Sequence, residues 1–355
     1  MMTMQVKQIA VLAYSESDFR GWEEFVAKHA EATFFHRIEW RRVISDGLRH
    51  RPYYLVAKMA GSIVGVLPLA EVKSRLFGHR LVSVPGCVYG GALGTSAEVV
   101  AALEAEACRL ARSLNVAALE LRHLRPSGAA SAAGDARWQH KDLYVTFRKE
   151  ISDQDDENLK AIPRKQRAMV RKGVGAGLTS ELTKDVRRFY RIYCESVRNL
   201  GTPVFPFPYF ELLQLVFGDD LEIAMVQHDG EDVACVMSFY FRAEVLPYYA
   251  GSRLAARALK ANDFMYWDLM RRAVRRGVKT FDFGRSKLGS GSYSFKKNWG
   301  FHPEPLNYRY FLVATSSVPD VNPNNPKYRL FIEAWKRLPL PIANIVGPLL
   351  ARNLG

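Results

Sequence analysis

The order of apolar and polar residues predicts the same series of elements twice along the chain. Alternating or continuous apolar runs predict strands at 61–74, 81–93 and 116–124, and again at 230–244, 245–252 and 278–286. Apolar residues that recur every three or four positions predict an amphipathic helix at 97–115 and another at 256–277. These helices end at Asn115 and Gly277, which are typical stop residues. The repeated order indicates a duplicated α/β unit.

A late strand is predicted to close each copy, at 144–151 in the first and at 307–313 in the second. This places a first domain at 1–155 and a second, with a basic linker helix, at 156–316. The linker helix opens near Pro163 and ends in a glycine-rich break.

An antiparallel start, a strand ending at a glycine turn, a helix and a parallel strand resemble the core of the GNAT acyltransferase fold. The resemblance implies that two neighbouring strands separate at the glycine turn and leave a wedge for an acyl donor or acceptor. We therefore expect an α/β (α+β) chain of two tandem GNAT-like domains with a short C-terminal helical tail. A chance repeat is the alternative.

The predicted tail covers residues 317–355 and combines a helix through FIEAWKRL with an apolar stretch, PLPIANIVGPLLARNL. That stretch is too short and too interrupted by proline to span a bilayer. Two placements stay open, against the second domain or on a membrane surface, and the first is slightly favoured.

A formal net charge of +14 indicates an anionic partner, which includes nucleic acid, phosphorylated substrates and acidic membrane surfaces. The first residues have neither a basic segment nor a small-residue cleavage site. We expect a cytoplasmic protein, with peripheral contact at the inner membrane as an open alternative. The four cysteines lie far apart without metal-binding spacing, so no metal and no disulfide is expected.

Several longer motifs resemble the FemAB family, and within it FemAB-related proteins of bacterial exopolysaccharide and PEP-CTERM/exosortase loci. They are FFHRIEWRRVI, LVSVPGCVYGGALG, RKQRAMVRKG, NLGTPVFPFPYF and FDFGRSKLGSGSYSFKKNWG, and the last is the most specific. The resemblance implies transfer of an amino acid from aminoacyl-tRNA to an amino group of a lipid-linked cell-wall precursor. The helical arm of characterised Fem ligases has no heptad-patterned counterpart in this sequence.

The acyl donor is therefore left open between aminoacyl-tRNA and acyl-CoA, and no cofactor is assigned. The GNAT fold usually holds the coenzyme A pyrophosphate in a glycine-containing turn at the start of its central helix. The matching place, GSRLAARA, lacks those glycines, which disfavours coenzyme A, although Arg253 and Arg257 could compensate.

The strongest candidate site is the end of the strand 278–286 and the loop after it. Strand alternation turns Asp282 away from Phe281 and Phe283, and Arg285 follows in the loop. We assign Asp282 and Arg285 to catalysis, with Asp282 as candidate base. A salt bridge between them that merely fixes the strand end is the alternative.

Residues around that strand end are assigned to substrate binding because hydroxyls, lysines and glycine turns can hold phosphate or carboxylate oxygens. These are Tyr249, Ser286, Lys287, Tyr293, Lys296 and Lys297. On the linker helix, Arg164, Arg167 and Arg171 share one face and predict an anion site, against the alternative of a solvated surface. His36 is a further candidate, although a histidine among aromatics more often packs at a helix start.

Together these features predict an acyl- or aminoacyltransferase that acts directly on an amino group of an anionic, lipid-linked saccharide or other cell-envelope precursor. No Ser-His-Asp pattern indicates a covalent intermediate. A coenzyme A-dependent N-acyltransferase is the alternative. A non-catalytic protein that binds polysaccharide or RNA is the second alternative.

Overall fold

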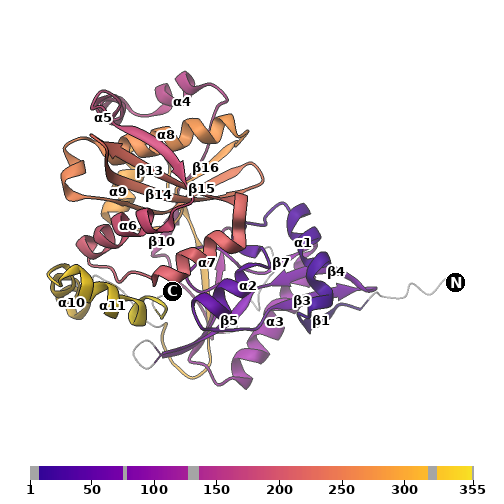
Figure 1. Cartoon of the computed structure of the whole chain (residues 1–355). Helices are drawn as coiled ribbons and strands as arrows, with labels where there is room; N and C mark the ends of the chain where they lie inside the picture. Colours follow the sequence, from indigo (N-terminus) through magenta and orange to yellow (C-terminus); the bar gives the residue numbers. More distant parts are fainter. Residues whose placement is uncertain (1–7, 75–77, 127–135, 319–325, 354–355) are drawn as a thin grey trace. The chain divides into compact units, whose positions relative to one another are not determined.

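The computed structural model describes residues 8–74, 78–126, 136–318 and 326–353, and forms two compact units (Figure 1). Unit 1 contains Met1–Asp142, Leu306–Val321 and Asn353–Gly355, and unit 2 contains Leu143–Pro305 and Asn322–Arg352.

Unit 1 contains a four-stranded and a six-stranded sheet. The strand order of the four-stranded sheet is β1 (Ala10–Ala13), β3 (Leu55–Met59), β4 (Ser62–Leu67), β7 (Leu93–Gly94). The strand order of the six-stranded sheet is β2 (Arg51–Pro52), β5 (Leu69–Ser74), β6 (Gly78–Ser83), β8 (Ala118–His123), β19 (Asn307–Leu312), β9 (Trp138–His140). Its α-helices are α1 (Phe19–Lys28), the short α2 (Trp40–Arg42) and α3 (Ala97–Ser113). The apolar stripe of α3 that the sequence predicts, including Val99, Leu103 and Ala107, is buried in the core of unit 1.

Unit 2 is built on a six-stranded sheet with a three-stranded sheet beside it. The strand order of the six-stranded sheet is β11 (Arg148–Glu150), β16 (Thr280–Asp282), β15 (Glu244–Ser252), β14 (Glu231–Phe241), β13 (Leu221–His228), β12 (Thr179–Thr183). The strand order of the three-stranded sheet is β17 (Ser286–Lys287), β10 (Tyr144–Thr146), β18 (Glu304–Pro305). The helices are α4 (Asp155–Ala161), α5 (Arg164–Val174), α6 (Val186–Leu200), α7 (Phe207–Phe217), α8 (Ala261–Arg275), α9 (Gly291–Asn298), α10 (Pro326–Lys336) and α11 (Leu340–Ala351).

Helices α6 and α8 cover opposite faces of the large sheet of unit 2 (Figure 1). Gly251 of β15 allows α6 to pack closely, because a β-carbon there would lie 3.0 Å from the backbone of Tyr193. The series of strand, glycine turn, helix and parallel strand is thus present as predicted in unit 2, and α3 with β6 and β8 repeats it in unit 1.

The two late strands correct the sequence prediction. The segment 144–151, expected to close the first copy, forms β10 and β11, and β11 pairs with β16 of unit 2. The segment 307–313, expected to close the second copy, forms β19 and pairs with β8 of unit 1. Each late strand has therefore been assigned to the wrong copy, because strand pairing depends on partners that are distant in sequence.

Within the C-terminal tail, α10 and α11 both contact α6. This confirms that the tail packs against the second unit. No helix in the described ranges is long and apolar enough to cross a membrane.

Candidate active site

Strands β15 and β16 of unit 2 pair over a short distance and then separate. Their parallel pairing joins only Glu244 to Thr280 and Val245 to Phe281, whereas β15 continues to Ser252. A β-bulge lies opposite this continuation, between Met237 and Ser238 of β14. The end of β16 is thus released from β15 at Asp282, where the sequence predicts the site.

Asp282 is held on several sides by donors. It has no exposed surface, and one carboxylate oxygen accepts hydrogen bonds from the Gly284 backbone N–H at 2.7 Å and the Thr146 hydroxyl at 3.4 Å. The other oxygen accepts from the Arg148 guanidinium at 3.0 Å, and Arg148 also pairs with Glu244. Arg148 is therefore an ion-pair partner of Asp282 that the sequence analysis did not identify.

Lys296 projects from α9 onto the same strand end. Its ammonium nitrogen donates to the carbonyls of Gly284 at 2.9 Å and Arg285 at 3.0 Å, and the residue is 9% exposed. Burial lowers the pKa of Lys296 to about 7; the negative charge of Asp282 opposes this shift and the positive charge of Arg285 adds to it. At neutral pH this lysine is present in both protonation states.

The other predicted loop residues lie around this pair. Arg285 and Lys287 lie over the ring of Tyr144, with 4.6 Å and 5.8 Å between charge and ring centre. Ser286 is buried, and its hydroxyl has no hydrogen-bond partner among the residues that the structure describes. Tyr293 packs edge-to-face against Phe147.

Two of the predicted residues lie in other surroundings. Lys297 is exposed, because adjacent positions on a helix point in different directions. Tyr249 is buried in an aromatic cluster, and its hydroxyl lies 2.9 Å from that of Tyr209. Desolvation raises the pKa of the Tyr249 hydroxyl well above its ordinary value, so this group stays protonated at neutral pH.

Sequence reasoning missed three residues of the site, Tyr144, Thr146 and Arg148. They occupy alternate positions of the segment that was assigned to the other copy. Their spacing of two is the signal that would have found them, because it places all three on one side of an extended chain.

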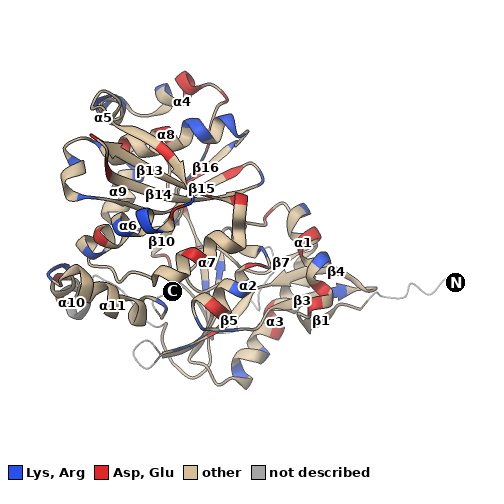
Figure 2. Cartoon of the chain, in the orientation of Figure 1, with Lys and Arg blue, Asp and Glu red and all other residues tan. Residues whose placement is uncertain are grey.

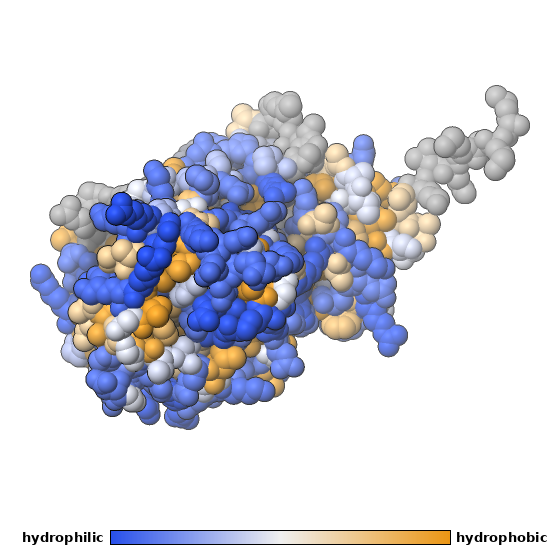
Figure 3. Space-filling model, turned by 90° about the horizontal axis from the view of Figure 1, so that it is seen from above, coloured by the Kyte–Doolittle hydropathy of each residue, from blue (hydrophilic) through white to orange (hydrophobic). Residues whose placement is uncertain are grey.

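The basic linker helix forms as predicted, but its arginines are not equivalent. Arg164 and Arg171 of α5 are exposed, as are Lys165 and Lys172. Arg167 instead donates to the carbonyls of Lys160 at 2.8 Å and Ile162 at 3.1 Å, at the end of α4. Figure 2 shows Lys and Arg along α5 and α8, and in the view of Figure 3 hydrophilic residues cover most of the surface around smaller hydrophobic areas.

This difference gives a prediction for a matched pair of variants. Arg167→Ala should lower the melting temperature, because a helix end loses its cap at a cost of about 1 kcal/mol. Arg171→Glu should leave the melting temperature unchanged and weaken binding of a polyanion such as RNA by about tenfold. Calorimetry and fluorescence anisotropy measure the two effects. Equal loss of polyanion binding in both variants would argue against a capping role for Arg167 and an anion-binding role for Arg171.

His36 lies in unit 1 with both ring nitrogens engaged. Nδ1 accepts from the Thr33 backbone N–H at 3.1 Å, and Nε2 donates to the Gly91 carbonyl at 3.0 Å. Burial lowers the pKa of His36 to about 4, so the ring is neutral at pH 7. The short helical turn Phe34–His36 ends at Arg37, where the backbone is extended. These contacts match the packed helix-start histidine that the sequence allows.

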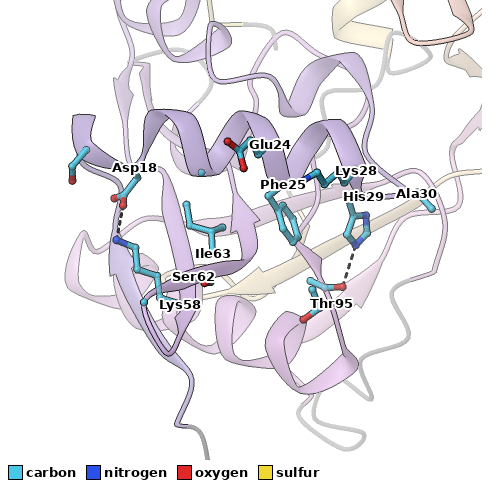
Figure 4. Close-up of a pocket in the computed structure, with 14 residues that line it drawn as sticks. Asp18, Glu24, Phe25, Lys28, His29, Ala30, Lys58, Ser62, Ile63 and Thr95 are labelled. Atoms are coloured by element: carbon cyan, nitrogen blue, oxygen red, sulfur yellow. Dashed lines mark hydrogen bonds and ion pairs between the residues drawn. The ribbon is translucent and has the colours of Figure 1, made fainter.

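A separate hollow of about 810 Å³ lies in unit 1 beside α1 and β4 (Figure 4). Charged groups line it, but Asp18 and Lys58 form an ion pair at 2.5 Å. His29 on the same wall lies 3.1 Å from the Gly94 carbonyl. In the described part of the chain, no group of histidine, cysteine and acidic residues is arranged to hold a metal ion.

Comparisons with known proteins agree with this architecture. Residues 158–297, within unit 2, match the family model of an acetyltransferase (GNAT) domain. The crystal structure of FemX superposes with a TM-score of 0.66 at 15% identity, over 91% of this chain and 100% of FemX. No curated protein matches the chain.

Two further solved structures are similar. One is a C-terminal domain assigned to a lysylphosphatidylglycerol synthetase of Agrobacterium fabrum, with a TM-score of 0.56, 15% identity and coverage of 84% of this chain and 92% of that one. The other is a tandem GNAT protein of the clavulanic acid biosynthesis pathway, with a TM-score of 0.53, 16% identity and coverage of 88% and 100%. The chain therefore has tandem GNAT-fold domains, and the family match to unit 2 supports an acyltransferase.

Proposed function

We propose that this chain is a FemAB-like transferase that moves an acyl or aminoacyl group directly onto an amino group of a cell-envelope or exopolysaccharide precursor. The observation that carries the proposal is Lys296, a buried amine with a pKa near 7 at the end of β16. Groups with such a pKa are suited to proton transfer at neutral pH. The similarity to FemX and to a lysylphosphatidylglycerol synthetase domain supports aminoacyl transfer as the form of the reaction.

The hydrogen bonds of Lys296 support a role in proton transfer. A neutral amine has two N–H groups and one lone pair. The carbonyls of Gly284 and Arg285 can accept those two N–H groups, so the lone pair is left to take a proton from the attacking amine. In the ammonium form the third N–H becomes a donor to the oxyanion or to the leaving group.

The proposed reaction is a single displacement. The acceptor nitrogen bonds to the donor carbonyl carbon, the carbon–oxygen or carbon–sulfur bond to the carrier breaks, and Lys296 passes the amine proton to the carrier. Because Asp282 has no exposed surface, we do not keep it as the general base. We assign it instead to the electrostatic stabilisation of the Lys296 ammonium. Arg285 lies beside Lys296 and is assigned to binding the anionic substrate.

A covalent cysteine intermediate finds no support in the thiols. The four cysteines are all buried. Burial raises the pKa of the Cys108 thiol to about 12, and it also raises the pKa values of Cys194 and Cys235. Thiols of this kind are protonated at neutral pH and are poor nucleophiles.

Coenzyme A remains the alternative donor. Arg257, in the turn just before α8, is exposed, whereas Arg253 lies 3.7 Å from Glu231. Helix α5, which carries exposed basic residues, packs against this region, because a β-carbon on Gly173 would lie 3.0 Å from the Lys260 carbonyl. A larger anion such as the acceptor end of tRNA would use both elements, so we favour aminoacyl-tRNA.

Ligand protection and transfer assays test the proposal. Charged tRNA, uncharged tRNA and acyl-CoA are each added, and the melting temperature is measured, since a ligand of the native state raises it. Labelled donors are then offered to amino sugars and lipid-linked saccharides, and transfer is followed by mass spectrometry. We expect protection and transfer with charged tRNA. Protection by acyl-CoA alone would support the alternative donor, and binding without transfer would support a binding protein.

A further inference from the structure

The C-terminal helix α11 uses a face of small residues to pack on unit 2. Ala343, Gly347 and Ala351 are buried, and a β-carbon on Gly347 would lie 3.1 Å from the Val204 backbone. Asn344 donates to the sulfur of Cys194 on α6 at 3.5 Å. The close-packing residues of α11 thus point inward, and its large side chains are left for the other face.

That other face is apolar and exposed to solvent. Ile345 is 73% exposed and Leu349 59%. They share the face with Ile342 and Val346, because these four positions are spaced three and four residues apart. We call these four residues of α11 the apolar tail face. Leu330 and Phe331 of α10 are exposed as well. Exposed apolar side chains gathered in this way mark an interaction surface.

Charge indicates the nature of the partner. Helix α11 contains no charged residue, and its flanks are basic. Between residues 326 and 352 the only acidic residue is Glu333, which pairs with Lys336; the basic residues are Lys327, Arg329, Lys336, Arg337 and Arg352. An apolar helix with cations at its ends is complementary to an anionic lipid surface, where apolar side chains enter the acyl region and cations remain at the phosphates.

We propose that the apolar tail face docks on an anionic phospholipid bilayer. The twelve-residue helix α11 lies in the interface, since a helix of this length, about 18 Å, is too short to cross the hydrocarbon core. The exposed face of α11 carries aliphatic side chains, so these meet the lipid. Exposed Arg337, between the two helices, meets the lipid phosphates. This inference stands independently of the donor and acceptor of the transferase reaction.

Vesicle sedimentation of the full chain tests the proposal. Unilamellar vesicles of phosphatidylcholine alone are compared with vesicles containing about 30% phosphatidylglycerol. The wild type should sediment with the anionic vesicles, and the double variant Ile345→Asp with Leu349→Asp should lose at least about tenfold in partitioning. Leu215→Asp is the matched control, because Leu215 is equally exposed on α7 outside the apolar tail face and its replacement should not change sedimentation.

A spectroscopic readout supplements sedimentation without adding a charge. The emission of Ile345→Trp should shift to the blue on anionic vesicles, and that of Leu215→Trp should not. Light scattering of the protein without vesicles tests whether a second copy of the chain binds the apolar tail face instead. Three results would each overturn the proposal: a wild type that stays in solution with both vesicle types, a control variant that loses binding equally, or a dimer that Ile345→Asp dissociates.

Discussion

Replacement of Lys296 by methionine should lower kcat by at least about 100-fold at pH 7, because proton transfer by a positioned group contributes about 10²–10⁴-fold. Lys297→Met is the matched control, since Lys297 is the next residue of α9 and is exposed. Initial rates of label transfer measure both variants. Similar rates in wild type and Lys296→Met would remove this lysine from the mechanism.

The same variant should not be less stable than the wild type at neutral pH. The pKa of Lys296 is about 7 in the folded chain and about 10.4 in an unfolded one, so burial of the ammonium destabilises the fold. That penalty is complete below about pH 7 and disappears as the pH rises toward about 10. Methionine removes the penalty together with two hydrogen bonds, and any stability advantage of the variant should shrink between pH 7 and 10. Calorimetry across this range provides the check.

The second large effect concerns the charges on either side of Lys296. Asp282→Asn should lower the pKa of Lys296 further, because the carboxylate raises it, and Arg285→Gln should raise that pKa, because the guanidinium lowers it. Asp282→Asn should also cost about 3 kcal/mol of stability, since Arg148 loses its buried partner. Arg285→Gln should cost less, because Arg285 is only partly buried.

Carbon-13 NMR of reductively methylated lysines follows this titration directly, and the pH dependence of kcat follows it in turnover. The two variants are expected to shift the pKa of Lys296 in opposite directions, and this is the decisive feature. Loosening of the structure by either variant would instead raise the pKa of Lys296 toward its ordinary value. An upward shift in both variants would therefore contradict the electrostatic explanation.

Strand alternation was sufficient to predict Asp282 as a special position, because the period of two along 280–283 is local. It could not predict what Asp282 contacts. Arg148 lies 134 residues away, and the hydrogen bond between them depends on the pairing of β11 with β16. Lys296 shows the same limit, because from the sequence it is one of two adjacent lysines and only the packing of α9 buries one of them.

The basic helix illustrates a different limit. The spacing of three and four correctly predicts that Arg164, Arg167 and Arg171 belong to one helix, but not that α4 ends beside it. Arg167 caps that end, which depends on a turn between the two helices that the sequence pattern did not predict. The tail was more predictable, since the sequence indicated a short helical tail and slightly favoured its packing against the second domain, where α10 and α11 contact α6.

The placement of the late strands has a consequence during synthesis on the ribosome. Strand β19, which lies between β8 and β9 in unit 1, is made only after Leu143–Pro305 of unit 2 have been synthesised. Until then β8 has an unpaired edge, which is prone to pair with other chains. Expression of either half alone, cut near residue 155, would remove β19 from unit 1 and β10 and β11 from unit 2. The nascent chain must therefore keep an unfinished first sheet soluble until its last strand arrives.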